Sequence, residues 1–194
     1  MRKHFYWLLF ALTACGGGSD APELYTLRAP VESMNYCRNA GKSIAVTEPV
    51  AAPGLDSSRM VVREAAHHQT FYQGVRWNAP VPQVLQHYMV ERLQNSGLFT
   101  SATTEDSAMR QAWLLEMQLH EFSVDKTAAR AVIRLTISIV NTAERTPLFT
   151  DNFQFSEPID GQSIDQIVAT FNRGLDRIST DMLNRIRAKL PACR

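Results

Sequence analysis

Apolar and polar residues alternate over three long stretches in the second half of the chain. Residues 113–124, 130–140 and 148–155 alternate large apolar and polar side chains over most of their length. The middle stretch has the cleanest pattern, carried by Ile133, Leu135, Ile137 and Ile139. A period of two is typical of a strand that buries one face. The short polar segments between these stretches, 125–129 and 141–147, predict antiparallel hairpins.

Two other stretches repeat their apolar positions every three or four residues, which predicts amphipathic helices. The first begins near Pro80 and ends at Gly97, a residue typical of the left-handed stop after a helix. The second begins after Ser163, and Gln166 three residues later completes a predicted capping box. Its apolar stripe comprises Ile164, Ile167, Val168, Phe171, Leu175, Ile178, Met182, Ile186 and Leu190. We expect this stripe to pack on the strands.

The rest of the chain adds shorter β-prone segments, at residues 24–27, 43–47, 60–63, 69–77 and 98–103. Alternation in the fourth segment predicts two faces: Phe71, Gln73, Val75 and Trp77 on one, and Tyr72, Gly74 and Arg76 on the other. The order of elements predicts a single α+β domain. We expect a mostly antiparallel or mixed β-sheet with two amphipathic helices packed on one face.

The beginning of the chain has the layout of a bacterial lipoprotein signal peptide. Arg2 and Lys3 precede an apolar run of about eight residues, far fewer than the roughly 20 that cross a bilayer. The run leads into Leu12-Thr13-Ala14-Cys15, a small-residue cleavage point followed by cysteine. The pattern predicts removal of residues 1–14 and acylation of Cys15, with palmitate as a typical chain. An ordinary signal peptide with an incidental cysteine is the alternative.

The predicted signal peptide divides the chain into three parts: residues 1–14, a lipidated N-terminus and flexible tether at 15–23, and a folded domain at 24–194. The tether is rich in glycine and has no apolar period. Gly16, rather than aspartate, follows Cys15. We therefore expect a lipid-anchored protein of the outer membrane that faces the periplasm.

Net charge and cysteine content restrict the class of partner and the covalent links that we expect. The net charge of the whole chain is +1, and basic residues do not cluster, which argues against a nucleic-acid partner. Cys37 and Cys193 remain after Cys15. In an oxidising compartment, a Cys37–Cys193 disulfide is the economical prediction, and two free thiols are the alternative.

Catalytic and metal-binding patterns are weak, so we expect no cofactor, metal ion or catalytic group. His67 and His68 are adjacent, and adjacent residues of a strand point to opposite faces. Glu116 and His120 share the polar side of their strand, where solvated residues are the simpler interpretation than an acid–base pair. Glu105 and Asp106 are interpreted as loop residues.

The segment from Tyr72 to Pro80 is the best candidate for contact with a partner. It combines aromatic residues, an arginine and prolines where a strand enters a helix. Aromatic residues and arginine anchor many protein interfaces. We predict Tyr72 and Arg76 as contact residues, and Trp77 as a core residue.

Several short motifs follow one another along the chain. They are the lipobox ending at Cys15, Tyr25-Thr26-Leu27, Ile44-Ala45-Val46, Pro53-Gly54-Leu55-Asp56-Ser57-Ser58-Arg59-Met60-Val61, Tyr72, Arg76-Trp77 and Leu93-Gln94-Asn95-Ser96-Gly97-Leu98-Phe99. Their order and spacing resemble the ABC-type transport auxiliary lipoprotein family, which includes the lipoprotein subunit of the paraquat-inducible intermembrane transport system. The resemblance spans nearly the whole mature chain.

The resemblance implies an accessory role without catalysis. Such lipoproteins are partners of an ABC transporter and of its substrate-binding protein of the mammalian-cell-entry (MCE) type, in a system that moves lipids or other hydrophobic molecules between membranes. On the same grounds we expect several copies of the protein to form a ring. Only Cys15 carries over from the family as a functional residue.

Two other functions stay open at this point. A lipid-carrying periplasmic module would shield an acyl chain itself and would contain a continuous apolar cavity between sheet and helices. A periplasmic hydrolase would present a concave site with perturbed acid–base groups. A docking subunit would instead have a filled core and an exposed strand edge or aromatic patch.

Overall fold

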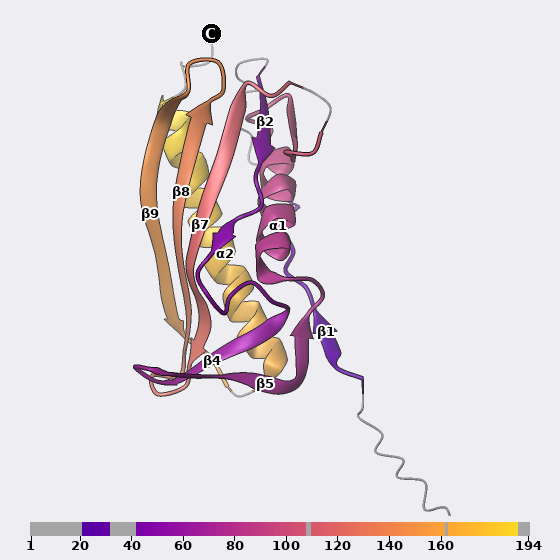
Figure 1. Cartoon of the computed structure of the whole chain (residues 1–194), viewed down its shortest axis with the longest axis vertical. Helices are drawn as coiled ribbons and strands as arrows, with labels where there is room; N and C mark the ends of the chain where they lie inside the picture. The colour runs from indigo at the N-terminus through magenta and orange to yellow at the C-terminus, as the bar shows by residue number, and fades with distance from the viewer. Residues whose placement is uncertain (1–20, 32–41, 108–109, 162, 190–194) are drawn as a thin grey trace, which may run out of the picture.

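A long strand in the middle of the sheet organises the domain. The computed structural model describes residues 21–31, 42–107, 110–161 and 163–189. In it, β7 (Trp113–Asp125) pairs antiparallel with β8 (Arg130–Asn141), which pairs antiparallel with β9 (Thr146–Pro158). The predicted hairpins are confirmed, because the three strands form a continuous meander (Figure 1).

Three short strands share the other edge of β7. β2 (Ser43–Val46), β3 (Val50–Ala51) and β4 (Arg59–Ala65) each pair parallel with successive parts of it. β2 also pairs parallel with β6 (Ser101–Thr104). β4 pairs antiparallel with β5 (His68–Trp77), which pairs parallel with β1 (Glu23–Tyr25). The result is a nine-stranded mixed sheet with two arms.

Two helices complete the domain, as the apolar spacing predicted. α1 (Val81–Ser96) ends at Gly97, whose φ of 68° is the predicted left-handed stop. α2 (Ile164–Lys189) begins with the predicted capping box: the Gln166 N–H donates to Ser163 Oγ at 3.3 Å, and the Ser163 N–H donates to Gln166 Oε1 at 3.1 Å. The α+β fold class is confirmed. The strand predicted for residues 98–103 begins later, because Leu98 and Phe99 are buried but precede β6. The short strand β3 was not predicted.

The space between sheet and helices is filled by aromatic and branched side chains. Phe122 of β7 stacks on Phe171 of α2 with ring centroids 4.4 Å apart, and Trp77 meets both rings edge-on. All three side chains are at most 2% exposed. They belong to one cluster that includes residues of both helices. The core role predicted for Trp77 is therefore confirmed.

A buried arginine joins the two helices. Arg92 of α1 is 1% exposed. Its guanidinium donates to Ser179 Oγ at 3.2 Å and Thr180 Oγ1 at 2.8 Å, and lies 3.2 Å from Asp176 of α2. Nearby, burial raises the pKa of Tyr88 to about 12. A buried guanidinium needs several acceptors to offset its desolvation, and α2 supplies them in one turn.

The alternation predicted for residues 69–77 is wrong in one respect. Val61 pairs with Phe71, yet Arg59 pairs with Arg76, so β5 carries extra residues between these pairs. Gly74 lies in this irregularity with a φ of 70°, a conformation that favours glycine. As a result, residues after the irregularity point to the face opposite the one that simple alternation from Phe71 would give them. Phe71 shares a face with Arg76, and Tyr72 lies on the opposite face.

Several predicted features lie outside the described residues. These are the signal peptide, most of the tether, Cys15, Cys37 and Cys193. In the part of the chain that the structure covers, no helix combines the length and the apolar character needed to span a bilayer.

α2 approaches the sheet closely at Gly174. A Cβ placed there would lie 2.6 Å from Phe155 Cδ1 and 2.8 Å from Ile133 Cδ1. Both neighbours are buried, so neither can move freely into solvent. The absence of a side chain therefore sets how deeply the helix packs.

We predict that Gly174→Ala lowers the free energy of unfolding. Alanine gains about 1 kcal/mol over glycine in a helix, but overpacking of a buried site costs about 1–3 kcal/mol. The expected net loss is about 1 kcal/mol, measured by urea unfolding. Asp181→Ala, on the exposed side of the same helix, controls for helix propensity. A more stable Gly174→Ala protein would contradict this packing.

Candidate docking surface

The face of the sheet that carries no helix is polar over β7, β8 and β9. Hydrogen bonds cross the strands in a row: His120 to Thr136 at 2.8 Å, and Thr136 to Asn152 at 2.7 Å. A second row joins Ser138 to Thr150 at 2.9 Å. Each of these side chains has a hydrogen-bond partner on the next strand.

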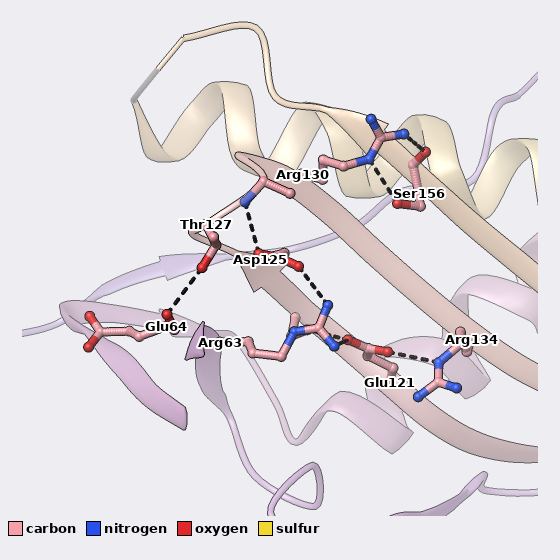
Figure 2. A network of polar contacts seen from close by, with 10 residues as sticks. Arg63, Glu64, Glu121, Asp125, Thr127, Arg130, Arg134 and Ser156 are labelled. Carbon is pink, nitrogen blue, oxygen red and sulfur yellow. Dashed lines mark hydrogen bonds and ion pairs between the residues drawn. The ribbon is translucent and has the colours of Figure 1, made fainter. Parts of the chain in front are cut away.

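Figure 2 shows a charged network at one end of this face. Glu121 of β7 accepts from Arg134 Nε at 2.8 Å and pairs with Arg63 at 3.0 Å. Arg63 also pairs with Asp125 at 2.8 Å. These charges lie on strands β4, β7 and β8 and join the two halves of the sheet. Glu121 is 9% exposed, so the two arginines largely cover it.

The turn after β7 extends the network. The Ala128 N–H donates to Asp125 Oδ1 at 3.0 Å, and the Thr127 hydroxyl donates to the Glu64 carbonyl at 3.1 Å. The backbone hydrogen bond from Ala128 is the largest influence that lowers the pKa of Asp125, and Arg63 adds to it. At the start of β8, Arg130 Nε donates to Ser156 Oγ of β9 at 3.0 Å.

The outer edge of β9 is open among the described residues, where β9 pairs only with β8. The Ile159 N–H donates to the Ala129 carbonyl, and β8 and β9 keep that register up to Phe149. Alternate residues of an antiparallel strand direct their backbone groups to opposite edges. Residues at every second position therefore present their N–H and C=O groups outward: Thr150, Asn152, Gln154 and Ser156. Of these groups, the Ser156 carbonyl already accepts from the Arg130 guanidinium.

The arm of the sheet formed by β4, β5 and β1 carries a different surface on the same helix-free face. The Arg59 guanidinium lies 4.0 Å from the centroid of the Phe71 ring, and Arg76 is exposed beside it on the neighbouring strand. Leu24 of β1 pairs with Arg76 and is 64% exposed. An aromatic ring, two arginines and an exposed leucine thus gather here. Exposed apolar side chains next to arginines are common at protein contacts.

The two predicted contact residues are not brought together. Arg76 lies on the helix-free face as part of this second arm. Tyr72 lies on the helix side, where it lines a pocket with Val124 and Ile167. Burial raises the pKa of the Tyr72 hydroxyl.

The other polar residues singled out in the sequence are solvated. His68 lies 3.5 Å from Glu64, and His67, Glu105, Asp106 and Glu116 are exposed. No group of three His, Cys, Asp or Glu side chains positioned to hold a metal ion occurs within the described part of the chain.

Sequence reasoning missed the network around Glu121 and the open edge of β9. One signal was available, because Glu121 follows His120 and precedes Phe122, where the alternation of β7 shifts by one residue. The register irregularity between Leu119 and Glu121 is the structural origin of that shift. The partners Arg63 and Arg134 come from other strands and carry no local signal.

Comparison with known proteins agrees with the fold. The family model for the ABC-type transport auxiliary lipoprotein component matches residues 25–183. The chain belongs to this family. The match includes all elements from β2 to β9 and most of α2. Among curated proteins, no sequence matches the chain.

Solved structures of this fold come from several bacteria. A Xanthomonas campestris protein superposes with a TM-score of 0.73 at 20% identity, over 83% of this chain and 92% of that one. A crystal structure titled as an uncharacterized protein gives 0.70 at 13% identity, over 86% and 99%. A hypothetical protein from Chlamydia trachomatis gives 0.52 at 8% identity, over 76% and 96%. At these identities the likeness concerns the fold alone.

We predict that Asp125 makes stability depend on pH in the acid range. Its pKa is lowered by folding, so its contribution is present above the ordinary value of 3.8 and is lost as the pH falls through the lower folded value. Asp125→Asn should flatten the fall of the urea midpoint below pH 3.8. Thr127→Val removes an uncharged hydrogen bond of the same turn and should leave the slope intact. Equal slopes in wild type and Asp125→Asn would refute this role.

Proposed function

We propose that this protein is a non-enzymatic docking subunit of an MCE-type ABC transport system for lipids or other hydrophobic molecules. The family match supports an auxiliary role beside an ABC transporter. In this proposal Cys15 carries the lipid anchor at the outer membrane, and the folded domain faces the periplasm. The partners are the transporter's membrane components and the MCE-type substrate-binding protein. A ring of copies and a Cys37–Cys193 disulfide are further parts of the proposal.

The observation that carries the docking role is the open edge of β9. Proteins commonly protect long edges with lysine, proline or a covering loop. Between Pro147 and Pro158, β9 contains neither lysine nor proline, and its outward backbone groups have no partner strand in the described chain. Addition of an extended segment to such an edge is a recurrent mode of protein recognition. The ordered side chains of the helix-free face would then contact the alternate residues of that segment.

The carrier function has less support in the body of the fold. A carrier that stored an acyl chain between sheet and helices would need a continuous cavity there. Trp77, Phe122 and Phe171 occupy the middle of that space and contact one another. A pocket of about 360 Å³ lies only at its end, beside Tyr72 and Ile167, among the residues that the structure describes. The docking function needs only a rigid sheet with an accessible edge, which the described residues provide.

A hydrolase also finds little support. The charged groups that gather around Glu121 form ion pairs with one another on the helix-free face of the sheet. Ion pairs of this kind hold strands together and leave no free base beside a cleft. We therefore propose that the protein supports transport without chemistry of its own.

We predict that Gln154→Pro weakens partner binding. Proline removes the outward N–H without breaking the ladder to β8, and the loss of one or two hydrogen bonds lowers affinity about tenfold. The lipidated protein is purified from membranes with its partners, and transporter subunits and the MCE-type protein are identified by mass spectrometry. Gln154→Ala removes the same side chain, keeps the N–H, and should retain binding. Equal recovery with both variants would exclude the β9 edge, and absence of both partner classes from the wild type would exclude the docking function.

We also predict that the mature protein begins at Cys15 and carries acyl chains. Intact mass of protein extracted from membranes should exceed that of residues 15–194 by a diacylglyceryl group and an amide-linked chain. Cys15→Ser should lose this mass, because serine has no thiol to carry the diacylglyceryl group. Retention of residues 1–14 in the membrane-extracted wild type, or an unmodified cysteine, would overturn the anchoring proposal.

A further inference from the structure

A pocket opens at one end of the domain, between the sheet and the first turns of α2. Its volume is about 360 Å³. Four side chains from four different parts of the chain give it apolar walls: Tyr72, Val124, Ile159 and Ile167. The exposed residues Lys126, Ala129 and Gly161 complete its lining. The pocket lies on the core side of the sheet, opposite the ion-pair network.

The size and chemistry of the pocket restrict its occupant. Ligand pockets typically measure about 300–1,000 Å³, so this pocket suits one narrow apolar group rather than a bulky one. Val124 and Ile167 are buried, and burial raises the pKa of the Tyr72 hydroxyl above its ordinary value of 10.0. Lys126 adds a cation to the lining, is largely exposed and pairs with Glu64 at 2.8 Å. An apolar chain with an anionic head matches this arrangement.

The position of the pocket relative to the N-terminal segment favours a lipid. β1 runs parallel to β5, with Glu23 opposite Val75, so the chain before Glu23 enters from the Tyr72 end of β5. Figure 1 shows β1 and the beginning of α2 at the same end of the domain. Residues 16–22 separate Cys15 from Glu23, a reach of at most about 29 Å. Under the proposed anchoring, the end that bears the pocket faces the membrane at about this distance.

We propose that this pocket binds one acyl chain of an anionic amphiphile, with the chain between Tyr72, Ile159 and Ile167 and the head beside Lys126. The site is separate from the β9 edge, so it adds an activity to the docking role. Its orientation toward the membrane rests on the proposed anchor, but binding itself does not. Two sources could supply the chain: a free fatty acid or lysophospholipid, or the acyl group on Cys15.

The test uses the full-length chain with Cys15→Ser, which lacks its own acyl groups. Dansyl-labelled undecanoic acid is titrated into the protein and then displaced by palmitate or by palmitoyl lysophosphatidylglycerol. We expect saturable binding and displacement. Ile159→Trp narrows the pocket and should lower affinity about tenfold or more. Val50→Trp, on the opposite face at a residue that is 73% exposed, is the matched control and should not change affinity.

A second measurement keeps the proposal testable if Ile159→Trp fails to fold. Stearate with a nitroxide at its chain end should broaden the methyl NMR signals of Ile167 and leave those of Ile44 unchanged. Lys126→Gln should weaken binding of palmitate more than binding of palmityl alcohol, because only the acid carries a charge. Absence of saturable binding, or broadening that spares Ile167, would overturn the proposal, and equal effects on acid and alcohol would overturn the placement of the head.

The lipidated wild-type protein distinguishes the two sources. If it binds the probe as Cys15→Ser does, the occupant is a free amphiphile. If it binds only after the acyl groups are removed, the occupant is the protein's own anchor. Partner recovery with Ile159→Trp should remain normal, so a failure of the acyl site and a failure of docking give different results.

Discussion

The pairing of β7 along both of its edges is the constraint on which the rest of the fold depends. On one edge β8 matches it from Trp113 to Asp125. On the other edge the chain returns three times, as β2, β3 and β4. A buried backbone group without a partner costs about 1–3 kcal/mol, so no long part of this edge can be left open. The short strands β2, β3 and β4 together therefore take the place of one long strand beside β7.

This composite edge explains both the two arms and the filled core. Because β2 and β4 each continue into separate partners, the sheet divides beyond β7 into an arm with β6 and an arm with β5 and β1. α1 connects the arms and meets α2 through the buried Arg92. Aromatic side chains fill the space that remains, and Gly174 lets α2 approach closely. The proposed docking edge of β9 and the proposed acyl pocket both lie at the margin of this core.

Much of this architecture was predictable from local patterns. The period-two stretches and the capping box at Ser163 correctly predicted β7, β8, β9 and the start of α2, because burial of one face and satisfaction of helix N–H groups are local requirements. β3 was missed because two residues have no period. Arg76 was assigned to the wrong face relative to Phe71 and Tyr72, since one irregularity at Gly74 reverses every position beyond it.

The polar and apolar sites could not be predicted for a further physical reason, which is that their parts come from separate elements. The ion-pair network needs β4, β7 and β8 in register, and the pocket needs β5, β7 and α2 to converge. Only the individual residues are visible in the sequence.

The β9 edge and the pocket are neighbours along the chain, because β9 ends at Pro158 and Ile159 already lines the pocket. Contacts hold the elements on both sides of this point. The capping box fixes the beginning of α2, Ile167 is buried in the core, and Glu157 pairs with Arg177 at 2.8 Å. An exposed ion pair contributes little, so the cap and the buried isoleucine hold α2 against the sheet more strongly. A ligand changes binding elsewhere only when it favours one of two conformations. Because these contacts favour a single arrangement of β9 and α2, we expect occupancy of the pocket and docking at the edge to be independent.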